Sequence, residues 1–195
     1  MSTKRPKPRL TPPEDSRLSE PQKALRDAIQ SGPRGRFRMV GPFGIWLQAP
    51  EFGMLAQQLG GHVRFKTSVP PRLSEFAILC TARHWRAQFE WFAHAPIAER
   101  TGVKPKTIQQ LQRGRRPAGA PADELAIYDF VKQLYRDRRV GDAIYKRVHK
   151  LFGDAGMVEL VGILGYYAMI SMTLNVFRAD IDADKPLPFR EPVSP

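Results

Sequence analysis

Cysteine is almost absent from this sequence of 195 residues. Because Cys80 is the only one, the chain can form no internal disulfide and no zinc site built from several thiolates. Cys80 lies among apolar residues at helical spacing, so we expect a buried and unreactive thiol. A secretion signal is also lacking, since no apolar run follows the positive charges near the N-terminus. We therefore expect a soluble, cytoplasmic protein.

The sequence has no sustained alternation of apolar and polar residues, which would indicate half-buried strands. Apolar residues instead recur at helical spacing. The longest apolar stretch, 157–177, approaches membrane-spanning length, but it contains Glu159 and Asn175, and we interpret it as a buried helix rather than a membrane span. The chain is long enough for one domain with a substantial core. These features predict a single all-α helical bundle.

Positive charge is unevenly distributed. The formal net charge is +12, and residues 1–38 contain ten Lys and Arg against four Asp and Glu. A basic, Pro-rich arm can bind nucleic acid or an anionic surface, or it can be simply solvated. No nucleic-acid-binding fold signature accompanies the charge. We therefore interpret residues 1–18 as a disordered basic arm and do not expect a nucleic acid partner.

Start and stop signals divide the remaining chain into helices. Ser19 and Gln22 form a capping-box pattern, Asp123 and Asp142 are expected to cap later helices, and Gly153 is expected to close one helix before the next. The predicted helices span about 19–30, 51–65, 72–84, 88–101, 105–113, 123–135, 142–152 and 155–177. The chain thus divides into N-terminal helices with a Gly/Pro-rich segment (19–66), a helical core (67–178) and an extended tail (179–195).

Two of these helices have apolar positions that we expect to face the core. In the helix over 51–65, which Gly60 and Gly61 weaken, these positions are Phe52, Leu55, Leu59 and Val63. In the helix over 142–152 they are Ile144, Tyr145, Val148, Leu151 and Phe152.

The segment 41–50 places large apolar side chains, including Phe43 and Trp46, between Gly and Pro residues. Such a segment must fold onto another surface, because an exposed patch of this kind promotes aggregation. It serves either as plain core packing or as the wall of a pocket in its own or a neighbouring subunit.

The most informative stretch is 71–102, where acids and histidines interrupt an apolar helical pattern. Glu90 and His94 are four residues apart, so they point the same way from one helix. A carboxylate beside an imidazole raises the pKa of the imidazole and fixes its tautomer, and such a pair can hold and pass a proton. A surface ion pair is the alternative, but the apolar surroundings favour a function.

This stretch resembles the central motif of the carboxymuconolactone decarboxylase and alkyl hydroperoxidase D superfamily. The peroxidase branch has a Glu, two Cys and a His. In this chain those positions are held by Glu75, Ala87, Glu90 and His94. Since both cysteines are missing, the resemblance argues against a thiol peroxidase cycle. The decarboxylase branch has Glu-x-x-x-His, which residues 90–94 supply. The likeness extends more loosely to 121–177 and 40–66.

The resemblance implies a helical bundle that assembles as a trimer or hexamer. It also implies cofactor-independent decarboxylation of a lactone or aromatic-derived carboxylic acid. His94 would be the acid/base, and Glu90 and Glu75 would tune it. The residues expected to bind substrate are Arg83 or Arg86, which would orient its carboxylate, and Trp91, Phe43 and Trp46.

Other functions remain open at this point. Glu90 and His94 are also a possible pair of metal ligands, with His84 or Glu75 as the third, although we expect no metal. A non-catalytic ligand-binding protein of the same fold is a further alternative.

Overall fold

The computed structural model describes residues 7–179, 181–182 and 184–190. The described residues contain helices and no strands, which confirms the all-α prediction. The elements are η1 (Asp15–Arg17), α1 (Glu20–Gln30), α2 (Gly41–Trp46), α3 (Pro50–Phe65), α4 (Pro71–Trp85), α5 (Gln88–Arg100), α6 (Pro105–Gln112), α7 (Ala122–Asp137) and α8 (Asp142–Phe177).

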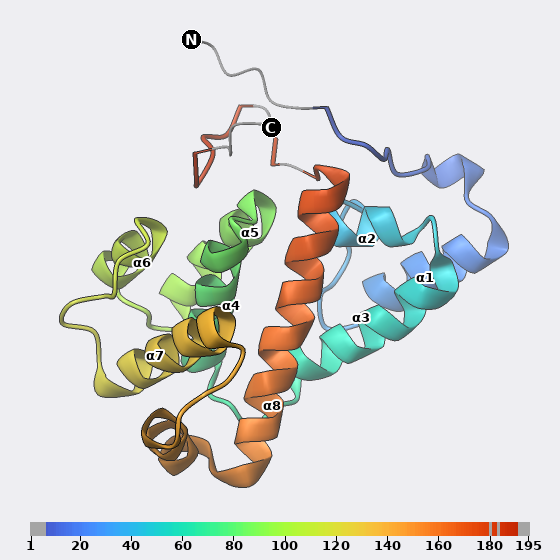
Figure 1. Ribbon diagram of the computed structural model, residues 1–195. Helices are drawn as coiled ribbons and strands as arrows, with labels where there is room; N and C mark the ends of the chain where they lie inside the picture. Colours follow the sequence, from blue (N-terminus) through green and yellow to red (C-terminus); the bar gives the residue numbers. More distant parts are fainter. Residues whose placement is uncertain (1–6, 180, 183, 191–195) are drawn as a thin grey trace.

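Helices α4 and α8 form the centre of the bundle. α8 runs between the group α1–α3 on one side and the group α4–α7 on the other (Figure 1). α4 packs against α5, α6, α7 and α8, so ten consecutive residues, 73–82, are buried. A helix that is apolar on every side is expected in such a position. The Arg72 guanidinium, in the first turn of α4, pairs with Asp123 and Glu124 at the start of α7.

Most predicted helix ends agree with the structure. Ser19 and Gln22 form the capping box of α1, and Arg86 makes the corner between α4 and α5 in a left-handed conformation, with φ of 52°. Gly153, with φ of 62° and ψ of −170°, interrupts α8 as predicted. Asp123 and Asp142 do not cap their helices, because they lie inside α7 and α8. The Asp123 carboxylate is instead engaged by Arg72.

The prediction for the buried face of α3 was wrong. The side chains of Phe52, Leu55 and Leu59 are 50%, 69% and 50% exposed, although Val63 is buried as expected. The buried positions of α3 are mostly small, and they include Gly53, Ala56 and Gly60. Small residues face inward because the neighbouring elements approach closely: a Cβ at Gly53 would lie 2.6 Å from Leu25 Cδ2.

α8 also leaves apolar residues on the surface. It is the one helix of the described residues long and apolar enough to cross a membrane, but a central core helix has the same composition. Its inward face is buried against α4 and α7, whereas Val158 and Val161 are exposed. Tyr145 and Leu151, which we expected to face inward, are also exposed.

Both ends of the described chain are held by the bundle. Residues 7–18 were expected to be mobile, but Arg9 donates two hydrogen bonds to α8, from its backbone N–H to Phe177 O and from its side chain to Val176 O. Leu18 is buried. Residues 1–6, the rest of the predicted arm, lie outside the described residues.

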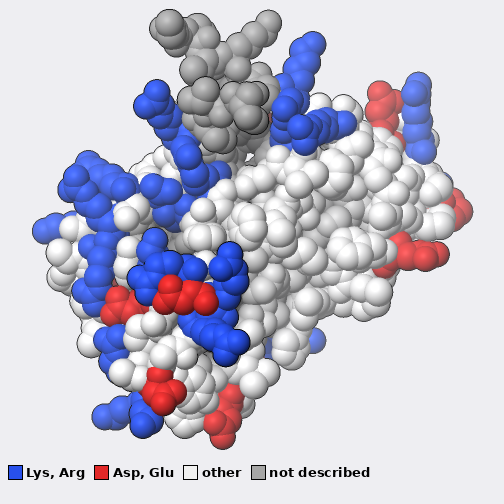
Figure 2. Space-filling view, in the orientation of Figure 1, with Lys and Arg blue, Asp and Glu red and all other residues white. Residues whose placement is uncertain are grey.

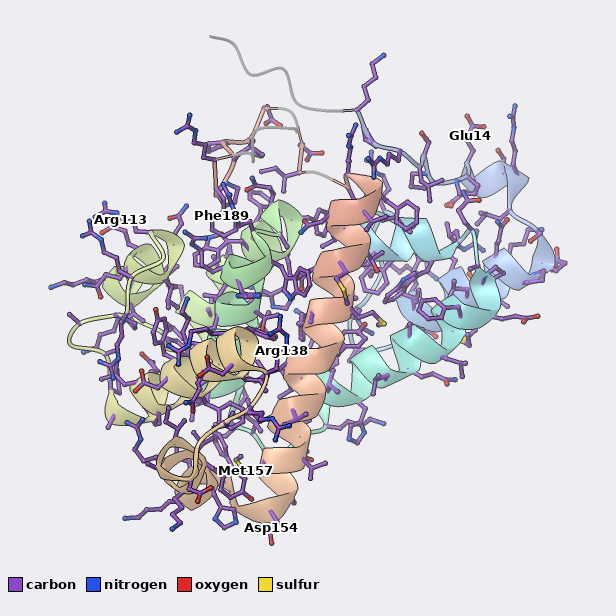
Figure 3. All side chains as sticks on the ribbon, viewed as in Figure 1. Glu14, Arg113, Arg138, Asp154, Met157 and Phe189 are labelled. Carbon is purple, nitrogen blue, oxygen red and sulfur yellow. The ribbon has the colours of Figure 1, made fainter. Side chains whose placement is uncertain are left out.

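The C-terminal tail is anchored at Phe189, which lies beside α5 on the side of α6 (Figure 3). The Gln88 side chain donates to Phe189 O at 2.7 Å and accepts from Phe189 N at 2.9 Å. Gln112, at the end of α6, donates to Pro188 O. The tail therefore contacts both α5 and α6, and we call its residues 188–189 the C-terminal strap.

Candidate active site

Glu75, His94 and Glu90 form a continuous chain of contacts between two helices. His94 Nδ1 lies 2.6 Å from Glu75 Oε2, and His94 Nε2 lies 3.0 Å from Glu90 Oε1. Glu75 comes from α4, whereas Glu90 and His94 lie one turn apart on α5. The structure therefore brings all three predicted acid–base residues together.

The three side chains are buried, with 6%, 4% and 4% of Glu75, Glu90 and His94 exposed. Burial alone lowers the pKa of His94, but the carboxylates of Glu90 and Glu75 more than offset it and raise the pKa to about 9. His94 is therefore protonated at neutral pH, with each ring N–H directed at a carboxylate.

The Tyr167 ring lies edge-on to His94, with the ring centroids 5.1 Å apart. Burial, and then the Glu90 charge, raise the pKa of Tyr167 well above its ordinary value, so the phenol stays neutral. Tyr167 closes the α8 side of the cluster and shields it from water. Such shielding strengthens the electrostatic interactions within the cluster.

A cavity of about 80 Å³ opens beside this cluster. Glu90 and His94 line it, together with apolar residues of α2, α5 and α8. The other residues that line it are Arg34, Pro42, Phe43, Arg64, Phe89, Ala93, Tyr166, Tyr167 and Ile170. Glu75 does not line the cavity, so it lies behind His94.

Two arginines supply positive charge to this cavity. Arg34, from the segment between α1 and α2, lies over the rings of Phe43 and Phe65, and Arg64 also lies over Phe65. Neither arginine forms an ion pair with any carboxylate of the described residues. Burial lowers the pKa of Arg34, and the nearby charge of Arg64 lowers it further. Arg34 Nε is buried without a hydrogen-bond partner among the described atoms.

The three apolar residues predicted to bind substrate differ in position. Phe43 lines the cavity. Trp46 is buried behind it, packed edge-on against the Phe43 ring. Trp91 is buried on another side of α5, where it packs against Phe189. Only Phe43 of these three is in a position to touch a ligand in the cavity.

The predicted substrate arginines lie elsewhere. Arg83 Nε donates to Gln112 O, and its guanidinium lies over the Phe189 ring. Arg86 donates to Arg190 O. His84 stacks on Tyr135. The sequence suggested Arg83 and Arg86 for the site because they flank the corner before α5. In the structure, the site residues of α4 and α5 face the opposite side of these helices from Arg83 and Arg86.

Sequence reasoning missed Arg34, Arg64, Phe89, Tyr166 and Tyr167. Arg34 was counted as one of the charges of the basic N-terminal region. The consecutive Tyr166 and Tyr167 in an otherwise aliphatic helix were the available signal, since two phenols are costly to bury without a partner.

The residues considered as metal ligands lie on both sides of α4. Both ring nitrogens of His94 face carboxylates, and His84 lies on the far side of α4. Among the described residues, no group of three or more His, Cys, Asp and Glu is arranged to hold a metal ion.

Of the comparisons with known proteins, only the one with solved structures found a similar protein. No family model and no curated protein matches this chain. One solved structure with a similar fold is described as an alkylhydroperoxidase AhpD core, an uncharacterized peroxidase-related protein from Ralstonia eutropha JMP134. The TM-score is 0.75 at 15% sequence identity, over 92% of this chain and 94% of the other. The chain therefore has the same helical fold as this AhpD core.

Proposed function

We propose that this protein is a cofactor-independent acid–base enzyme that acts on a small carboxylic acid. Decarboxylation of a lactone or aromatic-derived acid is the proposed reaction. The observation that carries the proposal is the buried chain of contacts Glu75–His94–Glu90, which ends at a cavity. The two arginines that line this cavity pair with no carboxylate in the described part of the chain.

The proposed proton path follows the contacts. Loss of CO2 from a lactone acid leaves electron density conjugated into the ring carbonyl, and a proton must reach the carbanion or enolate that forms. Glu90 and His94 both face the cavity, so they deliver this proton. Glu75 holds His94 Nδ1 from behind and stabilises the imidazolium. Glu75 is therefore a positioning residue.

Arg34 and Arg64 take the place that the sequence suggested for Arg83 and Arg86. A guanidinium binds a carboxylate through two parallel hydrogen bonds. In a cavity lined by Phe43, Phe89 and Ile170, these charges orient the substrate's carboxylate over Glu90 and His94. The cavity volume of about 80 Å³ is that of two to three waters.

A spectrophotometric assay with γ-carboxymuconolactone tests the proposal. Wild type is compared with Glu90→Gln and His94→Gln. The matched control is Glu99→Gln, which changes an exposed acid on the same helix. We expect turnover in wild type and in the Glu99 variant, and a loss of about a hundredfold or more in the two site variants, as is typical of removing a general acid.

Wild-type protein without turnover of this lactone or of a panel of related carboxylic acids would contradict the proposal. Equal activity in wild type and in Glu90→Gln would contradict the assignment of the site. A thiol peroxidase is not proposed, because the whole chain contains only Cys80, which is buried and whose pKa is raised by burial.

We also propose that the protein is a homo-oligomer. The family resemblance implies a trimer or hexamer, and exposed apolar side chains on α3 (Phe52, Leu55 and Leu59) support an interface there. Side chains of this size on one face of a helix are typical of an interaction surface. A second copy of the chain is the proposed occupant.

A further inference from the structure

A second cavity, of about 180 Å³, lies on the other side of α4. α4, α6 and α7 enclose it, and its lining includes Arg83, His84, Tyr128 and Lys132. None of its lining residues lines the cavity beside His94. It is therefore a separate feature that the proposed acid–base chemistry does not use.

The polar lining of this cavity consists of cations and hydrogen-bond donors, with no carboxylate among its residues. Neither Arg83 nor Lys132 pairs with an acidic side chain in the part of the chain that the structure describes. Burial, and then the Lys132 charge, lower the pKa of His84. Burial and the nearby Arg86 charge likewise lower the pKa of Arg83. The side chains that line the cavity therefore carry positive charge that no carboxylate of the lining offsets, although Glu124 and Asp129 act from behind it on Cys80 and Tyr128.

The surrounding surface has the same sign of charge. Residues 104–150 contain twelve Lys and Arg against five Asp and Glu, and Figure 2 shows Lys and Arg side chains gathered over the α6 and α7 side of the molecule. Several of the acids are already paired: Asp129 with Arg116 and Arg147, and Glu124 with Arg72. A field of this kind concentrates anions at the cavity.

The position of Arg83 is held by its neighbours. Its Nε donates to Gln112 O at 2.9 Å, and the guanidinium is stacked on Phe189 of the C-terminal strap. Gly114, with φ of 74°, lies so close that a Cβ there would be 2.7 Å from Arg83 Nη2. Because one edge of the guanidinium is fixed in this way, little side-chain entropy remains to be lost when its other nitrogens bind a ligand.

We propose that this cavity is a binding site for a small oxyanion, either a carboxylate or a phosphate group. Arg83 and Lys132 supply the charge, and the Tyr128 hydroxyl and the His84 ring supply neutral hydrogen bonds. The volume is that of about six waters, which suits inorganic phosphate or an acid of a few carbon atoms. The site is independent of the one that contains His94.

Binding of inorganic phosphate and of acetate, measured separately by isothermal titration calorimetry at constant ionic strength, tests this proposal. The imidazole resonances of His84 and His94, followed by NMR in the same titrations, locate the site. We expect phosphate or acetate to raise the pKa of His84. Lys132→Met and Arg83→Met should each weaken binding about ten- to a hundredfold, the effect of one charge-assisted hydrogen bond.

Arg115→Met is the matched control, because Arg115 is exposed and does not line the cavity. This variant should bind the anion like wild type. Lys132 is exposed, so its variant keeps the test valid even if Arg83→Met fails to fold. Unchanged affinity in Lys132→Met, or a His84 response no larger than that to sodium chloride, would overturn the proposal. Loss of binding in Arg34→Met alone would also overturn it, because the anion would then occupy the cavity beside His94.

Discussion

Gly60 of α3 lies directly against the hydroxyl of Tyr166 on α8. A Cβ at Gly60 would be 2.0 Å from Tyr166 Oη and 2.4 Å from its Cζ. Tyr166 is buried and lines the cavity beside His94. We expect Gly60→Ala to lower the free energy of unfolding by about 1–3 kcal/mol, as overpacking does, in urea denaturation.

The adjacent glycine provides the control. A Cβ at Gly61 would meet only Arg34 Nη1, at 3.9 Å, so Gly61→Ala should raise the free energy of unfolding by up to about 1 kcal/mol, because alanine favours a helix. Equal effects of the two substitutions would show that Tyr166 does not pack closely on Gly60.

The buried His94 gives the stability a specific pH dependence. Its pKa is raised from 6.5 to about 9 in the folded state, so the folded protein holds more protons than the unfolded chain between these values. The contribution is complete below pH 6.5 and is lost as the pH rises through 9. We expect the free energy of unfolding to fall by up to about 3 kcal/mol over this interval.

His94→Gln removes the titrating ring, so its stability should change less with pH than that of wild type across the same interval. Urea denaturation of both proteins at pH 6.5 and pH 9.5 gives the comparison. A wild-type stability that does not decrease more than that of the variant would contradict the raised pKa.

Arg34 and Arg36 are separated by one residue but differ in their positions. Arg34 lines the cavity beside His94, whereas Arg36 is exposed. We expect Arg34→Met to raise the KM for a carboxylic acid substrate about ten- to a hundredfold, through loss of a charge-assisted hydrogen bond, with a smaller change in kcat. Arg36→Met should leave both constants unchanged. Steady-state kinetics in which the two variants behaved alike would rule out Arg34 as the carboxylate-binding residue.

The exposed face of α3 predicts the effect of a charge on assembly. Leu55 is the most exposed of its apolar residues, so Leu55→Glu should leave the fold intact and dissociate the proposed oligomer. Size-exclusion chromatography with light scattering measures the mass, and Gln58→Glu, at an exposed polar position of the same helix, is the control. A monomeric wild-type protein would contradict this prediction.

Local signals were sufficient for most of the secondary structure. Ser19 and Gln22 marked one helix start, and Gly153 marked an interruption that the structure shows. These signals act between residues within one or two turns, so they can be read directly from the sequence. The buried face of α3 was not predictable in this way, because large apolar residues were assigned to the core. The close approach of α1 and α8 leaves space only for Gly53 and Gly60.

The sequence by itself determined the all-α fold and the pairing of Glu90 with His94, because helical spacing puts residues four apart on one face. The family resemblance, rather than helical spacing, added Glu75 to this pair. Only the tertiary structure decided which cations share the cavity with this cluster. Arg83 and Arg86 are near it in sequence but face α6 and the C-terminal tail. Arg34 instead reaches it from the segment between α1 and α2, and Arg64 from α3. The direction in which a helix faces depends on its packing partners, and these come from distant parts of the chain.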